Sequence, residues 1–231
     1  MPNSAYYHKE LLPESLNLMQ AEQVLAKHFK NHVLIGVDEA GRGPLAGPVV
    51  AAAVVVGVVT GQARRPAPTT PTITALNDSK KLSEKQREKI FEELPNYCKH
   101  YSIAEASAQE IDELGILNAN FLAMRRALAP IISSLEEKKQ LYKILVDGNL
   151  CIREIDESLQ MPIIKGDGRV ACIAAASIFA KVHRDRLMVK FSEQFPNYGF
   201  EKHKGYGTKA HLEAVKKLGL CEIHRKSFNF L

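Results

Sequence analysis

The stretch that decides the fold of this chain reads His32-Val33-Leu34-Ile35-Gly36-Val37-Asp38-Glu39-Ala40-Gly41-Arg42-Gly43-Pro44. Its first half is apolar and rich in β-branched residues, which predicts a β-strand. Two adjacent carboxylates, Asp38 and Glu39, end this strand, and a glycine turn follows at once. Carboxylate oxygens suit Mg²⁺ or Mn²⁺, and glycines without a Cβ let a phosphate or sugar approach the backbone. Because Arg42 adds a planar fork of donors for a phosphate, the stretch predicts metal-assisted phosphodiester chemistry.

The segments around this stretch predict a mixed α/β sheet flanked by helices. Val33–Val37 and Val49–Val58 are expected to form an antiparallel hairpin around the glycine loop. Later strands are expected at Tyr97–Ala106, Leu141–Val146 and Met161–Lys165, and helices at Ser15–Phe29, Ser83–Leu94, Glu110–Leu128, Val170–Phe195 and Thr208–Leu218. Strands that begin as a hairpin and then alternate with helices are typical of a mixed sheet.

Local signals predict where several helices begin and end. Ser83 and Gln86 form a capping box at a helix start. The helix from residue 110 is expected to break or kink near Gly115 and to end at Pro130. The loop Thr60–Thr74, rich in proline and threonine, is expected to carry no chemistry. Residues 1–30 are expected to form an N-terminal helical arm, and residues 31–231 one catalytic domain.

Three separate segments end in an acid beside a glycine turn: Asp38-Glu39, Asp147-Gly148 and Asp167-Gly168. Strand ends gather functional groups in α/β sheets, and converging carboxylates repel one another unless a cation is present. Four acids could hold two divalent ions roughly 3.5–4 Å apart, the geometry for in-line displacement at phosphorus. The alternative for Asp147 or Asp167 alone is an ordinary Asp-Gly turn. Since neighbouring strand residues point to opposite faces, Asp38 is the strongest candidate ligand and Glu39 the weakest.

The composition is that of a globular protein with a mild preference for anionic partners. The chain has 231 residues, 45% hydrophobic and 25% charged, with a net charge of +5. Seven Lys or Arg stand against three Glu between Glu201 and Lys226, so most of the excess charge lies near the C-terminus. The longest apolar run, Val49 to Val59, is shorter than the ~20 residues of a membrane helix. No signal-peptide pattern and no Cys-x-x-Cys pair occur, so we expect a cytoplasmic protein with reduced thiols.

The motifs, taken together, resemble those of bacterial ribonuclease HII over about residues 32–228. The supporting segments are Gly36 to Gly47, Leu76-Asn77-Asp78-Ser79-Lys80-Lys81-Leu82, Val146-Asp147-Gly148-Asn149, Lys165-Gly166-Asp167-Gly168-Arg169, Ala174 to Asp185 and Tyr198 to Thr208. Six motifs in the correct order are far more specific than any one of them.

The resemblance implies a ribonuclease H-like fold, with a mixed five-stranded sheet flanked by helices and a helical C-terminal part. It implies a divalent-metal endoribonuclease that cleaves the RNA strand of RNA–DNA hybrids and cuts at single ribonucleotides in duplex DNA, leaving 5′-phosphate and 3′-hydroxyl ends. The family's metal-binding acids match Asp38, Glu39, Asp147 and Asp167, the residues that strand-end reasoning also selects. Two ions, Mg²⁺ or Mn²⁺, are expected with substrate.

The resemblance also implies which residues contact the nucleic acid. Gly41, Arg42 and Gly43 match a loop that contacts the 2′-hydroxyl and the scissile phosphate. Tyr206 matches a tyrosine that packs on the deoxyribose after the ribonucleotide; without the resemblance it would be an ordinary surface aromatic. Phosphate-backbone contacts are expected from Lys80, Lys81, Lys165 and Lys181, each of which, on spacing alone, is more often a solvated lysine.

Two alternatives remain open at this point, and we expect a monomer under each interpretation. One is a nuclease of the same fold that cuts DNA junctions or all-DNA substrates, against which the Gly41–Gly43 loop and Tyr206 argue. The other is a non-catalytic nucleic-acid-binding module, for which the basic C-terminal segment would suffice. It leaves the glycine-flanked carboxylates without a purpose, because acids in a binding groove repel phosphate.

Overall fold

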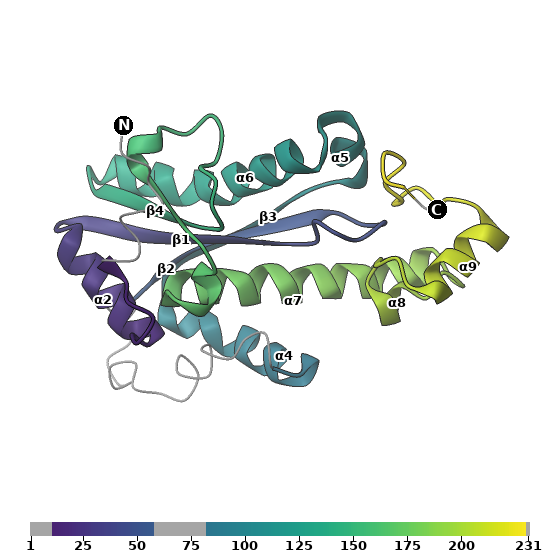
Figure 1. Cartoon of the computed structure of the whole chain (residues 1–231), viewed down its shortest axis with the longest axis horizontal. Helices are drawn as coiled ribbons and strands as arrows, with labels where there is room; N and C mark the ends of the chain where they lie inside the picture. Colours follow the sequence, from purple (N-terminus) through teal and green to yellow (C-terminus); the bar gives the residue numbers. More distant parts are fainter. Residues whose placement is uncertain (1–10, 58–81, 230–231) are drawn as a thin grey trace.

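The computed structural model describes residues 11–57 and 82–229 and contains one five-stranded sheet (Figure 1). Its strands are β1 (His32–Ala40), β2 (Val49–Val56), β3 (Cys98–Ala106), β4 (Leu141–Asp147) and β5 (Gln160–Ile163), in the order β3-β2-β1-β4-β5. β1 pairs antiparallel with β2 and parallel with β4. The predicted hairpin and mixed sheet are confirmed.

Helices cover both faces of the sheet. They are α2 (Leu18–His28), α4 (Glu84–Glu93), α5 (Ala108–Leu114), α6 (Ile116–Glu137), α7 (Ala171–Gln194), α8 (Phe200–His203) and α9 (Lys209–Leu218), with short 3₁₀ turns η2 (Leu94–Tyr97), η3 (Glu157–Leu159) and η4 (Gly166–Gly168). Figure 1 shows α5 and α6 on one face and α7, α4 and α2 on the other. The C-terminal elements α8 and α9 lie beyond the end of the sheet and form the helical C-terminal part that was predicted.

The sheet and α7 approach each other closely at Gly36 on β1. A Cβ there would overlap the backbone of Cys172 and stand 2.5 Å from the backbone nitrogen of Ile173. The alanines of α7 continue this contact, since Ala174 and Ala176 are fully buried. Small side chains on both surfaces let α7 approach the strand that carries Asp38.

Local signals predicted most helix boundaries to within three residues, the largest of these differences being at α2, which begins at Leu18 and not at Ser15. One boundary differs by more. Both hydrogen bonds of the Ser83–Gln86 capping box form, and Gly115 separates α5 from α6 as expected. The prediction that the second of these helices ends at Pro130 is wrong, because α6 continues to Glu137. Proline removes one backbone donor at a cost of about 3 kcal/mol, whereas ending the helix there would expose Ile131 and Leu135, which are buried in the core under α6.

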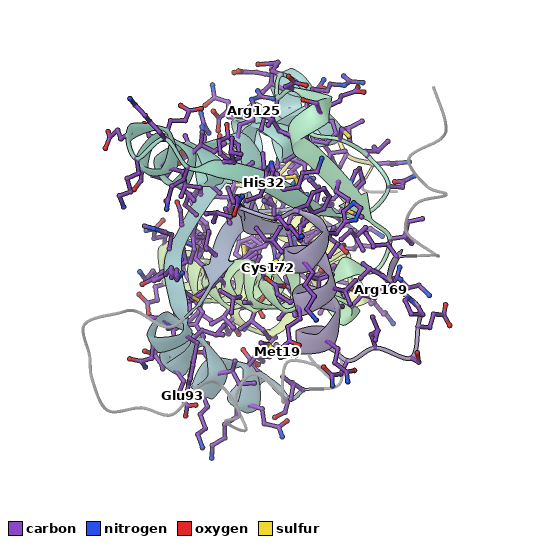
Figure 2. The ribbon with its side chains drawn as sticks, turned by 90° about the vertical axis from the view of Figure 1, so that its left-hand side faces the viewer. Met19, His32, Glu93, Arg125, Arg169 and Cys172 are labelled. Atoms are coloured by element: carbon purple, nitrogen blue, oxygen red, sulfur yellow. The ribbon has the colours of Figure 1, made fainter. Side chains whose placement is uncertain are left out.

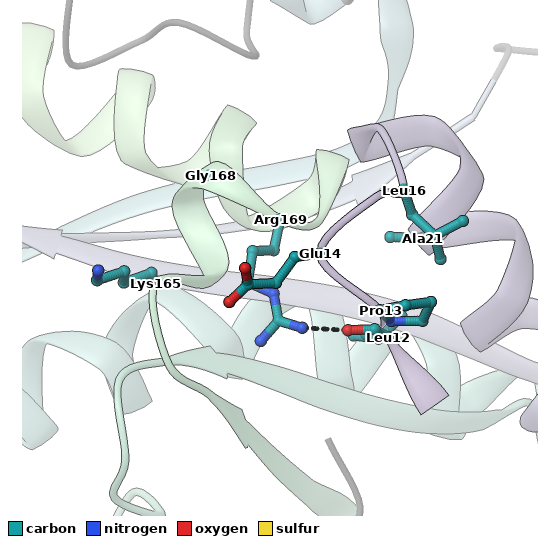
Figure 3. A pocket seen from close by; sticks show the side chains of 8 residues that line it. All are labelled: Leu12, Pro13, Glu14, Leu16, Ala21, Lys165, Gly168 and Arg169. Atoms are coloured by element: carbon teal, nitrogen blue, oxygen red, sulfur yellow. Dashed lines mark hydrogen bonds between the residues drawn. The ribbon is translucent and has the colours of Figure 1, made fainter. Parts of the chain in front are cut away.

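The N-terminal segment packs on the start of α7. A guanidinium nitrogen of Arg169 donates to the carbonyl of Leu12 (Figure 3), and the N–H of Cys172 donates to Glu22 at 3.1 Å. Figure 2 views this end of the molecule, with Cys172 and Arg169 beside α2. Leu25 of α2 is buried with residues of β4 and β5. The division of the chain at residue 30 stays a prediction.

Three further expectations concern the chain as a whole. The four cysteines are free thiols, as expected. In the described part of the chain, no helix has the length and apolar character to cross a membrane. The predicted Thr60–Thr74 loop, together with Lys80 and Lys81, lies outside the described residues.

Candidate active site

Asp38 lies near the end of β1, on the face covered by α7. Val37 pairs with Val146 in the parallel β1–β4 ladder, so Asp38 and Asp147 follow side by side. Ser177 of α7 hydrogen-bonds the Asp38 carboxylate, and the N–H of Glu39 donates to its Oδ1 at 2.7 Å. Asp38 is only 5% exposed, so its oxygens are held by short, local contacts.

Glu39 points to the opposite face, because β1 continues as a regular strand through Ala40. There its carboxylate receives a hydrogen bond from Asn120 of α6 and an ion pair from Arg42 at 3.3 Å. Asn120 is buried, and among the described side chains its Oδ1 is a buried oxygen without a hydrogen-bond partner. Glu39 therefore lies on the other side of the sheet from Asp38, as the alternation of strand residues predicted.

Asp167 joins the cluster through a turn, since β5 ends at Ile163, before the expected end at Lys165. Its N–H, on η4, donates to Asp147 Oδ1 at 3.3 Å, and its side chain is buried. Gly166 allows this approach, because a Cβ there would lie 3.3 Å from the same carboxylate oxygen. The structure thus brings the four predicted acids to one end of the sheet.

The acids affect one another electrostatically. Burial raises the pKa of Asp38 well above its ordinary value, and the negative charges of Asp147 and Glu39 raise it further. Burial also raises the pKa of Glu39, as does Asp147, while Arg42 opposes the shift. In the described residues, no three Asp, Glu, His or Cys side chains are placed so that together they could hold a metal ion. The carboxylates are directed at Ser177, Arg42 and backbone N–H groups instead.

This donor set suits a hard divalent cation. All four groups supply oxygen, the ligand that Mg²⁺ and Mn²⁺ prefer. A cation would also offset the repulsion that raises the pKa of Asp38. The residues that would hold it are Asp38, Asp147 and Asp167, with Glu39 from the opposite face.

Two buried arginines hold the glycine loop that follows β1. Arg184 donates to the carbonyls of Ala46, Pro48 and Lys204 at 2.9–3.0 Å. Arg225 donates to the carbonyls of Gly41, Arg42, Gly47 and Pro48. Gly41 has φ +98°, and a Cβ there would lie 2.5 Å from Cδ of Arg184. Only glycine fits this position, because the backbone is left-handed and the arginine fills the space.

Sequence reasoning missed both arginines. Arg184 falls inside a family motif and Arg225 in the basic C-terminal segment, but neither position shows in sequence that the side chain is buried. Burial lowers the pKa of Arg184 to about 10 and that of Arg225 to about 9. Both still carry their charge at neutral pH, and backbone carbonyls satisfy their donors.

Tyr206 lies across from the glycine loop. A Cβ built on Gly43 would lie 3.9 Å from the Tyr206 ring, and the ring is 45% exposed. Tyr206 and Gly41 of the loop border a groove of about 350 Å³ whose lining also includes Glu39, Ser177, Lys181 and, as a further cation that the sequence did not single out, Arg87. The groove joins one predicted acid to the predicted substrate contacts.

Of the four lysines predicted to contact phosphates, Lys165 and Lys181 are among the described residues, and they lie in different places. Lys181 lines the groove and pairs with Asp185 at 2.7 Å. Lys165 is exposed and lines a separate pocket with Leu12 and Arg169, from which its ammonium group points away in Figure 3. The structure therefore brings Lys181, and not Lys165, to the groove beside Tyr206.

Comparisons with known proteins agree with this geometry. The family model for ribonuclease HII matches residues 35–230. The chain is 52% identical to the ribonuclease HII of Fusobacterium nucleatum over 203 residues, which is 87% of this chain and 86% of that one. It is 48% identical to the ribonuclease HII of Endomicrobium trichonymphae over 194 residues, 84% of each chain.

Solved structures show the same fold. RNase HII of Archaeoglobus fulgidus, solved with PCNA, has a TM-score of 0.61 at 26% identity over 84% of this chain and 92% of that chain. Bst-RNase HIII in complex with Mn²⁺ has a TM-score of 0.64 at 19% identity over 90% of this chain and 70% of that one. Fold and family together define a ribonuclease H-type endoribonuclease, a class that acts on RNA–DNA hybrids. Within this class, the chain belongs to the ribonuclease HII family.

Proposed function

We propose that this ribonuclease cuts at single ribonucleotides embedded in duplex DNA as well as in continuous RNA–DNA hybrids. The observation that carries the proposal is the position of Tyr206, which lies against Gly43 of the glycine loop and lines the same groove as Gly41 and Glu39. A ribose seated in this groove, beside the ring and the loop, would present its 2′-hydroxyl to the loop backbone. This hydroxyl distinguishes RNA from DNA at a given site.

The chain's own groups orient the substrate in this proposal. Arg42 and the backbone of Gly43 contact the scissile phosphate, while Tyr206 packs on the deoxyribose that follows the ribonucleotide. Arg184 and Arg225 act indirectly, because they hold the loop carbonyls and so fix the direction of the loop. Bidentate donors such as Arg42 stabilise the charge that develops on phosphate oxygens.

Divalent cations would be held by Asp38, Glu39, Asp147 and Asp167. Two Mg²⁺ or Mn²⁺ ions, when bound, would lower the pKa of the attacking water and stabilise the leaving oxygen, which yields 5′-phosphate and 3′-hydroxyl ends. Asp38 and Asp147 lie at the ends of the neighbouring strands β1 and β4, so they are the proposed anchors. The Mn²⁺ complex of Bst-RNase HIII supports a divalent metal in this fold.

Phosphates on either side of the cut would be bound by lysines. Lys181 is the described lysine in the groove, and we propose Lys80, Lys81 and Lys165 as more distant contacts. Such contacts set affinity and its dependence on salt, without base preference. We further propose a monomer, since one chain carries the whole site, and a cytoplasmic location, which the free cysteines support.

The test compares three labelled duplexes: one with a single ribonucleotide, one RNA–DNA hybrid and one of DNA alone. Wild type should cut the first two in Mn²⁺ or Mg²⁺ and leave the third intact. Asp38→Asn and Asp167→Asn should each lower the rate by about 10²-fold or more while hybrid binding persists. Asp156→Asn, an exposed carboxylate that caps η3, is the matched control and should cut normally. Cleavage of the DNA duplex would instead support a DNA nuclease, and wild-type rates in both site variants would refute the assignment of the acids.

A further inference from the structure

A chain of hydrogen bonds in the C-terminal part ends on the backbone of Tyr206. Nδ1 of His211, on α9, lies 2.9 Å from the carbonyl oxygen of Tyr206. Nε2 of the same ring lies 3.1 Å from Nε2 of His224. Nδ1 of His224 lies 2.9 Å from the backbone nitrogen of Cys221. The three contacts link residue 221 to the residue that faces the glycine loop.

The partners determine which nitrogen carries each proton. A carbonyl oxygen only accepts, so Nδ1 of His211 must carry the hydrogen that it donates to Tyr206. Nε2 of a neutral His211 is then an acceptor, and Nε2–H of His224 must donate to it. Nδ1 of His224 is left as the acceptor for the N–H of Cys221. All three hydrogen bonds are therefore donated in the same direction, from Cys221 toward Tyr206, and this arrangement requires both imidazoles to be neutral.

The surroundings keep the two rings neutral. His211 and His224 are 0% and 1% exposed, and the ring of Phe200 packs against both. Burial lowers the pKa of His211 and lowers that of His224 to about 4. The titratable groups that face them are His203, whose ring stacks on His211 at 4.4 Å, together with Cys221 and Tyr198.

The turn that carries Tyr206 is held on two sides. On one side, the N–H of Leu45 donates to the carbonyl of Gly205 at 2.8 Å, which ties the turn to the glycine loop. On the other side, His211 holds the carbonyl of Tyr206, which also accepts the N–H of Thr208 at 2.8 Å. His203 steadies the same turn, because its Nδ1 accepts the N–H of Gly205 at 3.2 Å.

We propose that His211 is a positioning residue, which holds the Tyr206 ring at the distance from Gly43 needed to recognise the junction of a ribonucleotide with a following deoxyribonucleotide. This inference rests on the proposed role of Tyr206. His211 touches neither substrate nor metal in this view, and it acts through the backbone. Its loss should therefore affect the embedded-ribonucleotide substrate more than a continuous hybrid, which has a ribose at the position where Tyr206 packs.

The test uses two substitutions of His211, each of which keeps one of its two hydrogen bonds. His211→Asn places an amide nitrogen where Nδ1 stands, so it can still donate to Tyr206. His211→Gln reaches toward His224 instead and loses the donor to Tyr206. For His211→Gln, we expect kcat/KM on a duplex with one ribonucleotide to fall about 5- to 10-fold, the worth of one hydrogen bond. We expect a change below about 2-fold on a continuous hybrid, and His211→Asn to stay within about 2-fold of wild type on both.

The outcomes separate this inference from the function on which it rests. Equal losses on both substrates in both variants would mean a purely structural role and would overturn the proposal, as would no loss in His211→Gln while Tyr206→Ala is impaired. If Tyr206→Ala cuts both substrates normally, the role of Tyr206 falls and the positioning proposal falls with it. Long-range ¹H–¹⁵N NMR of the imidazoles is an independent check at pH 7. It should show the proton of His211 on Nδ1 and that of His224 on Nε2, and the reverse tautomers would refute the chain.

Discussion

Replacing Asp38 with Asn should make the protein more stable and inactive. Burial, followed by the charges of Asp147 and Glu39, raises the pKa of Asp38. A carboxyl group with a raised pKa stabilises the fold only while it is protonated. Its contribution is complete below the unfolded value of 3.8 and is lost as the pH rises through the folded value. At pH 7.5 the ionised carboxylate therefore destabilises the fold, and an amide of the same shape removes this penalty.

The size of the effect follows from the neighbouring charges. At a separation of roughly 5–6 Å, slightly more than the spacing of adjacent strands, two like charges repel by about 3 kcal/mol at an effective dielectric constant of 20. Because wild type relieves part of this repulsion by binding a proton, we expect a gain of about 2 kcal/mol in the free energy of unfolding, or about 4–8 °C in Tm for a chain of this length. Asn can still accept from the N–H of Glu39 and bond to Ser177, so no hydrogen bond is lost.

The assay is thermal unfolding of both proteins in EDTA and in excess Mn²⁺. Wild type should gain about 2.7 kcal/mol when the ion is at a hundred times its Kd, whereas Asp38→Asn should gain far less. The difference between the two proteins should also shrink from pH 8 to pH 5. Asp156→Asn, which replaces an exposed carboxylate that caps η3, should follow wild type throughout. A variant that melts below wild type in EDTA at pH 7.5, or that gains as much from Mn²⁺, would refute the reasoning.

Three further substitutions test the packing around the site. Gly36→Ala places a Cβ against the backbone of Cys172, so urea denaturation should show a loss of at least about 3 kcal/mol; a loss below 1 kcal/mol would mean that α7 shifts freely. Gly43→Ala meets only Tyr206, at 3.9 Å, so Tm should stay within about 2 °C while cleavage at a single ribonucleotide falls about 10-fold, and unchanged cleavage would argue against close approach at this loop. Glu22→Ala and Glu22→Gln both remove a carboxylate whose pKa burial raises, but only Ala removes the acceptor for the N–H of Cys172, so Glu22→Ala should be less stable than Glu22→Gln by about 1 kcal/mol in denaturation. Equal stability of the two variants would show that the hydrogen bond does not contribute.

Features that depend on near neighbours were predictable. The Ser83–Gln86 capping box joins residues three apart, so it forms as the pattern indicates. The β1–β2 hairpin needs only two apolar strands and the glycine loop between them. Pro130 shows the limit of this reasoning, because distant core contacts outweigh the backbone donor that proline removes.

The candidate acids could be selected from the glycines beside them in the sequence. The directions in which their side chains point could not be predicted in this way. No pattern in the chain says that Asp38 meets Ser177 while Glu39 meets Asn120. Alternation along β1 predicted that Asp38 and Glu39 point to opposite faces of the sheet. Only the packing of α7 and α6 on those faces shows which side chains they contact. Lys165 illustrates the same limit, since its motif matches although its side chain lines another pocket.

The order of residues was enough to recognise the ribonuclease H class, because the family's motifs are short contiguous segments that the sequence displays directly. It could not show that Arg184 and Arg225 hold the glycine loop, or that His211 reaches Tyr206 in concert with His224. Arg184 and Arg225 bond carbonyls more than a hundred residues away, and burial among them decides both charge and partner. Such contacts exist only once the C-terminal part has closed over the end of the sheet, where each donor must find an acceptor out of reach of water.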